Sequence, residues 1–212
     1  MSPNSSITAV VYDFGGVLIT PITNALGEVA DWHDVPMVTM LEILMGPRER
    51  STHDHPWHRA ERGEMPTAAM QGEIGPFAEA KGVQLRGDEY ERVLRGDFLV
   101  HNSVVDRIGD LRARGYATGL LTNSFREFRA VLEEHVDFSL FDVVVDSSEV
   151  GHRKPEPAIY AIVAERLGVP GEQILYLDDF AANLDGAQAA GWQTIHVVDV
   201  ATALEELEHA LA

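Results

Sequence analysis

Four groups of polar side chains follow short apolar runs of the kind that form buried strands. They are Asp13, Thr122 with Asn123, Lys154, and the pair Asp178 and Asp179. Singly each is a weak signal, because an aspartate after a strand is often just a helix cap and a lysine in a loop is common. Jointly they are informative, since a parallel sheet gathers the carboxyl ends of its strands into one crevice, where open α/β sheets bind ligands.

Together these residue types fit the chemistry of phosphoryl transfer. Asp13 offers a carboxylate nucleophile that could form an aspartyl-phosphate. Asp13 and Asp179 offer oxygen ligands to Mg²⁺, a hard cation that proteins usually bind together with a substrate phosphate. The Thr122 hydroxyl, the Asn123 amide and the Lys154 ammonium would grip phosphoryl oxygens and neutralise developing charge.

Short apolar runs that alternate with helical patterns predict the elements that position these residues. We expect strands near residues 7–12, 116–121, 141–145, 174–177 and 194–198. After residue 101 a helix is expected between each pair of strands, one of them over 125–134. This alternation indicates a parallel sheet covered on both faces. We therefore predict a doubly wound, Rossmann-like α/β core built from residues 1–20 and 101–212.

Residues 21–100 have a different character, with no convincing strand but several helical patterns. Five of the six methionines lie in this stretch, at positions 37, 40, 45, 65 and 70. We interpret them as filling a small helical core. The alternative is that some of them line an adaptable pocket, since methionine conforms to irregular apolar shapes. The prediction is a helical cap inserted into the α/β core at residues 21–100.

Composition limits the partners of this chain of 212 residues. A net charge of −18 argues against binding to nucleic acid and to anionic membranes. Any phosphate site must then be locally positive, which is feasible because salt screens distant charges over roughly 8 Å. Without cysteine the chain forms no disulfide, and cytoplasmic localisation is the default expectation. We expect no secretory signal and no membrane span, because no suitable apolar run is present.

Five segments together resemble one known family. They are VVYDFGGVL at 10–18, WHRAERGEM at 57–65, LLTNS at 120–124, GHRKPEPAIY at 151–160 and ILYLDDFAANLDGAQAAGW at 174–192. In this order and spacing they resemble the haloacid dehalogenase (HAD) superfamily, specifically its phosphatase-like members with a helical cap inserted after the first motif. The resemblance spans almost the whole chain and is specific for fold and family, but not for substrate.

The resemblance implies a role for each matching residue. Asp13 would be the nucleophile and a metal ligand, the main-chain carbonyl of Gly15 would also ligate Mg²⁺, and Asp179 would be a direct ligand. Asp178 would act on the metal through a water molecule. The phosphoryl group would be bound by Thr122, Asn123 and Lys154.

Gly15 departs from the family pattern, because typical phosphatases carry a second aspartate there, in an Asp-x-Asp motif. That aspartate protonates the leaving oxygen and then activates the hydrolytic water. Its loss would cost about 10²–10⁴-fold in rate, roughly 3–5 kcal/mol. Three interpretations stay open: a cap residue substitutes for it, the substrate has a good leaving group such as an acyl phosphate, or the protein is a weak catalyst.

The cap sequence carries a second cluster of polar residues: His53, Asp54, His55 and His58. This spacing could bind a transition metal, but no clear fourth ligand is present. The plain interpretation is a set of solvated histidines at the start of a helix. The third is that His55, His58 or Glu61 projects toward Asp13 and supplies the missing proton, since histidine suits proton transfer near neutral pH.

The sequence therefore predicts a Mg²⁺-dependent phosphatase of a small phosphorylated metabolite. One alternative is a 2-haloacid dehalogenase, because a halide leaves carbon without being protonated and needs no metal. The paired aspartates are not readily explained by that reaction. The other alternative is a weakly catalytic binding or regulatory module, which would have no evident reason to retain Asp13 and Lys154 together. The substrate and the oligomeric state stay open.

Overall fold

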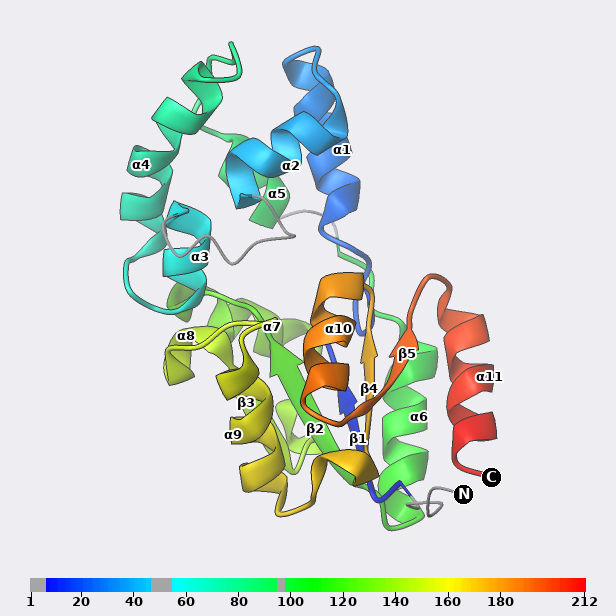
Figure 1. Cartoon of the computed structure of the whole chain (residues 1–212). Coiled ribbons are helices and arrows are strands. Elements are labelled where there is room, and N and C mark those ends of the chain that lie inside the picture. The colour runs from blue at the N-terminus through cyan, green and yellow to red at the C-terminus, as the bar shows by residue number, and fades with distance from the viewer. Residues whose placement is uncertain (1–6, 47–54, 95–97) are drawn as a thin grey trace.

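A five-stranded parallel sheet forms the centre of the α/β core (Figure 1). The computed structural model describes residues 7–46, 55–94 and 98–212. The strand order is β3-β2-β1-β4-β5. The strands are β1 (Ala9–Tyr12), β2 (Ala117–Thr122), β3 (Val143–Asp146), β4 (Ile174–Asp178) and β5 (Gln193–His196). Each matches one of the predicted apolar runs to within two residues at either end, and the predicted α/β fold class is confirmed.

Both faces of the sheet are buried, as the alternating side chains of β1 show. Val10 and Tyr12 belong to the apolar cluster formed with α6 (Asn102–Ala113) and α11 (Val200–Ala210). Ala9 and Val11 belong to the cluster on the opposite face, formed with α9 (Pro157–Leu167) and α10 (Ala181–Ala189). A central parallel strand that is apolar at every position is typical of a doubly wound sheet.

The connections after β2 and β3 differ in detail from the prediction. The helix expected over 125–134 begins as a 3₁₀ turn, η1 (Arg126–Phe128), and becomes the α-helix α7 (Arg129–His135). A short helix that was not predicted, α8 (Ser147–Val150), follows β3, where the Asp146 side chain accepts a hydrogen bond from the Ser148 N–H. Further 3₁₀ turns are η2 (Phe138–Leu140) and η3 (Gly171–Gln173).

Within the described residues of the segment 21–100 the structure has five helices. They lie over the carboxyl ends of the strands (Figure 1). We refer to these helices, with the described residues that connect them, as the helical insert: α1 (Thr23–Trp32), α2 (Met37–Met45), α3 (Pro56–Glu61), α4 (Thr67–Glu79) and α5 (Glu89–Leu94). They pack around their own apolar cluster, in which Met40 and Met70 are fully buried and to which Phe125 of the α/β core contributes. The expected role of the methionines as core residues is thus confirmed at Met40, Met45 and Met70, and Met65 packs against the same cluster, whereas it is wrong for the exposed Met37.

The chain enters and leaves the helical insert at nearly the same point. The Thr20 N–H donates to the Leu99 carbonyl at 2.9 Å, and the His101 N–H donates to the Leu18 carbonyl at 2.8 Å. These two crossing segments, 18–20 and 99–101, therefore lie side by side. Within the described residues, no helix is long and apolar enough to cross a membrane.

Candidate active site

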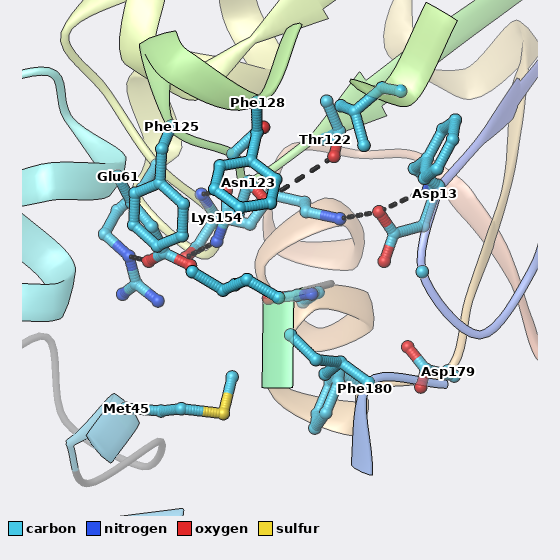
Figure 2. A pocket seen from close by; sticks show the side chains of 18 of the residues that line it. Asp13, Met45, Glu61, Thr122, Asn123, Phe125, Phe128, Lys154, Asp179 and Phe180 are labelled. Carbon is cyan, nitrogen blue, oxygen red and sulfur yellow. Dashed lines mark hydrogen bonds and ion pairs between the residues drawn. The ribbon is translucent and has the colours of Figure 1, made fainter. Parts of the chain in front are cut away.

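The carboxyl ends of the strands bring the predicted residues to one cavity of about 180 Å³, which lies between the sheet and the helical insert (Figure 2). Asp13 directly follows β1, Thr122 is the last residue of β2, and Asp179 directly follows β4. Lys154 reaches the same cavity from the loop between α8 and α9. The sheet topology thus produces the expected grouping of residues that lie far apart in the sequence.

Asp13 and Lys154 form a buried ion pair in which Oδ1 and Nζ are 2.7 Å apart. Oδ1 of Asp13 also accepts a hydrogen bond of 2.7 Å from the Phe14 N–H. Burial raises the pKa of Asp13 well above its usual range, with Lys154 opposing that shift and Asp178 and Asp179 adding to it. Burial alone would lower the pKa of Lys154, but Asp13 and Asp178 outweigh burial and raise it. The cavity therefore holds a buried ammonium, but carboxylates surround it, so the locally positive site expected from the sequence would need a bound cation as well.

Asp178 is fully buried and accepts hydrogen bonds from four protein groups. Its Oδ2 lies 2.8 Å from the Lys154 Nζ and also accepts a hydrogen bond from the Tyr176 hydroxyl. Its Oδ1 accepts from the Phe180 N–H at 2.7 Å, and the Asn183 amide contacts both oxygens at 3.0–3.1 Å. Asp178 thereby orients Lys154 toward Asp13, which is a structural role in addition to the predicted indirect role at the metal.

Three carboxylates gather close enough to share one cation. Asp13, Asp178 and Asp179 each offer an oxygen atom, and these atoms all lie within 4.8 Å of one another. A set of carboxylate oxygens suits a hard cation such as Mg²⁺. Among the described residues, this is the one cluster of histidine and acidic side chains that could hold a metal ion. His53 and Asp54, half of the metal cluster considered from the sequence, lie outside the described residues.

Two neighbouring glycines of the first motif serve the site differently. Gly16 has a φ of +76°, and a Cβ added there would lie 2.3 Å from Oδ2 of Asp179, so only glycine leaves room for this carboxylate. A Cβ added at Gly15 would meet no atom within 4 Å. Gly15 lines the cavity, and the first atom of a side chain at this position would therefore meet no clash.

Asn123 clamps the main chain of Lys154. Its Oδ1 accepts from the Lys154 N–H at 2.8 Å, and its Nδ2 donates to the Lys154 carbonyl at 3.0 Å. These contacts indicate a positioning role for the amide, and direct binding of the phosphoryl group by Asn123 stays a prediction. Thr122 is buried beside it and lines the cavity (Figure 2).

The three residues considered as surrogate acids occupy different places on α3. His55 precedes the helix, and its Nδ1 accepts a hydrogen bond of 3.2 Å from the Trp57 N–H. Its ring packs against Phe77, with 4.6 Å between ring centroids, and is not part of the cavity wall. Burial, followed by the neighbouring His58, lowers the pKa of His55 to about 4. His58 and Glu61, by contrast, do line the cavity.

Glu61 connects the helical insert to the loop that carries Lys154. Its Oε1 accepts from the Trp57 Nε1 at 2.8 Å, and its Oε2 accepts from the Arg153 Nε (Figure 2). Both partners are themselves largely buried, so the carboxylate of Glu61 is held in place by two donors. Of the two histidines among the three surrogate candidates, His58 is thus the one that lines the cavity.

Sequence reasoning missed Tyr176, Asn183 and Arg153. Tyr176 has the appearance of an ordinary core residue within β4, and its hydroxyl gives no signal in the sequence. Asn183 stands five residues after Asp178, where the first turn of α10 returns its side chain to the carboxylate. Arg153 precedes Lys154 directly, but its partner Glu61 lies 92 positions earlier in the chain, a separation that no local pattern reveals.

Comparison with known sequences connects this geometry to a family. Residues 7–191 match the haloacid dehalogenase-like hydrolases. The chain is 32% identical to mouse (Mus musculus) acyl-CoA dehydrogenase family member 10, over 99% of this chain and 20% of that protein. It is 37% identical to the phosphoglycolate phosphatase of Escherichia coli K12, over 47% of this chain and 40% of the phosphatase. The chain thus spans about a fifth of the length of the mouse relative.

Solved structures share the fold. A HAD-family enzyme from Bacteroides thetaiotaomicron, in complex with magnesium and inorganic phosphate, has a TM-score of 0.62 at 20% identity, covering 90% of this chain and 93% of that one. An L-2-haloacid dehalogenase has a TM-score of 0.65 at 22% identity, covering 91% and 87%. At such low identities these likenesses establish the fold alone.

Proposed function

Because this chain belongs to the haloacid dehalogenase-like hydrolase family, we propose that it hydrolyses a small phosphate monoester, with Mg²⁺, through an aspartyl-phosphate on Asp13. The observation that supports this proposal best is the cluster of three carboxylates around the buried ion pair of Asp13 and Lys154. A nucleophilic carboxylate, a fixed ammonium and further oxygen ligands for a cation are the parts that phosphoryl transfer needs.

The proposed reaction has two displacement steps at phosphorus. First, a carboxylate oxygen of Asp13 attacks, the bond between phosphorus and the ester oxygen breaks, and the leaving oxygen takes a proton. Next, water attacks the aspartyl-phosphate and gives its proton back to the group that protonated the leaving oxygen, the bond between phosphorus and Asp13 breaks, and inorganic phosphate leaves. Lys154 and the Thr122 hydroxyl would neutralise and orient the phosphoryl oxygens in both steps. Asn123 holds the main chain of Lys154, and Asp178 holds its ammonium group.

The carboxylates of Asp13 and Asp179 and the main-chain carbonyl of Gly15 would hold Mg²⁺, with Asp178 contributing through a water molecule. When bound, the ion would supply positive charge to the phosphoryl oxygens. The oxygen-rich donor set fits this ion.

We further propose that the helical insert acts as a cap on the site, with domain boundaries near 20/21 and 100/101. The adjacent crossing segments at 18–20 and 99–101 support these boundaries. The position of the helices above the carboxyl ends of the strands supports a role in excluding water from the reaction.

Glycine at position 15 has no side chain that could donate a proton, so we propose that another group in the cavity protonates the leaving oxygen. His58 is the best placed of the three candidates, since it lines the cavity, whereas Glu61 is held by Trp57 and Arg153 and His55 lies outside the cavity wall. Replacement of each residue by alanine tests this. A fall in kcat for His58→Ala alone supports the assignment. Unchanged kcat in all three variants would remove the surrogate acid and leave an acyl phosphate substrate or slow turnover.

A second candidate function is hydrolytic dehalogenation of a 2-haloacid, which is favoured by the absence of an acid at Gly15. A halide needs no proton to leave. Asp13 would attack carbon and displace the halide, and water would then hydrolyse the resulting ester. This reaction has no need of further carboxylates to hold a metal ion, so the phosphatase stands first.

One panel of assays separates the candidates. An aryl phosphate, acetyl phosphate and a 2-haloacid are offered with and without Mg²⁺ to the wild type and to Asp13→Asn. Asp185→Asn, which removes an exposed carboxylate on α10, is the matched control. We expect phosphate release that needs both Mg²⁺ and Asp13 and survives Asp185→Asn. Halide release without phosphate release would instead establish the dehalogenase.

A further inference from the structure

The side of the cavity away from Asp13 and Asp179 is apolar. Figure 2 shows Met45 from the helical insert and Phe125 and Phe128 from the α/β core around this space. Ile22, Trp57 and Leu132 are among the other apolar side chains that line the cavity. Met45 therefore has the pocket-lining role that was the alternative for the methionines of the insert. These six side chains come from both parts of the molecule, so the apolar space exists only where the insert meets the core.

The charged groups near this space neutralise one another. Arg153 and Glu61 line the cavity and form an ion pair with side chains that are 12% and 6% exposed. The guanidinium is thereby engaged by a carboxylate of the protein. Among the described residues, the cavity wall carries the carboxylates of Asp13, Asp179 and Glu61 but only two fixed cations, Arg153 and Lys154. Each of these cations is already paired with a carboxylate of the protein. A leaving group that carries its own carboxylate or a second phosphate would be poorly matched to this wall.

The size of the cavity limits the group that fits inside it. Its volume is about 180 Å³. An apolar cavity of roughly 150 Å³ is known to hold a benzene molecule. Because this volume includes the polar end that would take the phosphoryl group, the apolar remainder suits a short alkyl group or at most a single small ring, attached to the oxygen that leaves phosphorus.

We propose that the substrate is the phosphate monoester of an apolar alcohol, with an aryl or alkyl body of about ring size, and not a sugar phosphate or a phosphorylated carboxylic acid. This inference rests on the phosphatase function proposed above. Water and the ester are consumed, and the apolar alcohol and inorganic phosphate are released.

A homologous series of esters tests the proposal without changing the chemistry of the leaving group. Ethyl, butyl and hexyl phosphate differ in apolar length but release alcohols of similar acidity. Each buried methylene group should raise kcat/KM by about fourfold until the cavity is filled. We expect hexyl phosphate to exceed ethyl phosphate by at least about tenfold, and to exceed glycerol phosphate and phosphoglycolate. A flat series, or a preference for either polar ester, would overturn the proposal and leave the phosphatase function standing.

The variant Phe128→Ala tests whether the apolar wall of the cavity causes the preference for longer esters. Phe128 is half-buried in the cavity wall, and its loss should lower kcat/KM for hexyl phosphate about threefold or more relative to ethyl phosphate. Phe77→Ala removes a phenylalanine of the insert that lies outside the cavity wall, and should leave the ratio of the two esters unchanged. Equal ratios in wild type and Phe128→Ala would contradict the assignment of the apolar wall.

Binding of non-hydrolysable analogues separates the two proposals. Hexylphosphonate and ethylphosphonate are titrated calorimetrically into the wild type in the presence of Mg²⁺. Tighter binding of hexylphosphonate without turnover of any phosphate ester would retain the apolar ligand class and reject the phosphatase function. Equal or undetectable binding of both would reject the apolar ligand class, whichever esters are hydrolysed.

Discussion

The α/β core and the helical insert contribute to the site by different physical means. The core supplies charged groups that are held by hydrogen bonds with short, defined geometry, such as those among Lys154, Asp178 and Asn183. The insert supplies mainly apolar surface, held by packing around Met40 and Met70. Chemistry is thus built on the carboxyl ends of the strands, where geometry is fixed by the backbone. Shape is supplied by helices that are held together by apolar packing.

The largest effect is expected where the core loses a charge. Lys154→Met would leave the buried carboxylates of Asp13 and Asp178 without their ammonium partner. We expect kcat to fall by about 10²–10³-fold or more, and the free energy of unfolding to fall by about 3–5 kcal/mol. Urea titration followed by circular dichroism measures the second quantity. Lys81→Met, which removes an exposed ion pair with Glu42 on the insert, should cost no more than about 1 kcal/mol.

If both lysine variants had similar stability, the contrast between a charged core site and a tolerant insert surface would be wrong.

The insert should respond most to a loss of packing. Met40 is fully buried in α2, and Met40→Ala should lower the free energy of unfolding by about 2–5 kcal/mol through the cavity it creates. Met37 lies on the same helix with 46% of its surface exposed, so Met37→Ala should change stability by less than about 0.5 kcal/mol. Chemical denaturation of the two variants gives the comparison. A loss below 1 kcal/mol for Met40→Ala would show that the insert is not held by its core.

Gly15→Asp tests whether the absence of an acid in the first motif limits the rate. Gly15→Asp introduces a carboxylate into open space beside the nucleophile. If protonation of the leaving oxygen limits the rate, turnover of alkyl phosphates should rise about tenfold or more, and turnover of acetyl phosphate should rise less. Steady-state kinetics on the two substrate classes measures the ratio. An equal change for both classes would show that the missing acid does not limit the reaction.

Two glycines offer the smallest and most closely matched comparison. At Gly16 an added methyl group would collide with the Asp179 carboxylate at a positive φ, so Gly16→Ala should lower stability by about 1–2 kcal/mol and weaken the Mg²⁺ dependence of turnover. Gly27 lies within α1, where a Cβ meets no atom, and Gly27→Ala should raise stability by about 0.5–1 kcal/mol. Thermal unfolding with and without Mg²⁺ gives both values. A change of the same sign in both variants would contradict the distinction.

The core was predictable from sequence to a much greater degree than the contacts within it. Alternating apolar runs and helices suffice to place Asp13 and Lys154 at one edge of a parallel sheet, because that outcome depends on topology. The use of Asn123 to clamp the main chain of Lys154 depends on side-chain geometry across 31 positions, for which the sequence holds no local signal. The helix expected from Phe125 begins later, because a 3₁₀ turn intervenes before Arg129.

For the insert, the sequence predicts helices but not which of their side chains reach the cavity. Its helices follow from periodicity, but which methionine lines the cavity and which fills the core depends on how the helices pack. Met40 and Met45 are five positions apart on one helix and belong to the same apolar cluster, but of the two only Met45 also lines the cavity. Likewise, His58 lines the cavity and His55 does not. This difference depends on how one short helix, α3, lies above the site.

The hydrogen bonds between the crossing segments 18–20 and 99–101 bear on how such a protein can diversify. The chain leaves and re-enters the core at one point. With respect to the sheet, the insert is therefore a loop whose two ends are joined by hydrogen bonds. The entropy of closing a loop grows only slowly with its length, so exchange or resizing of the insert would cost the core little. An ancestral core could thus acquire new specificities by grafting, with the nucleophile and its lysine inherited unchanged.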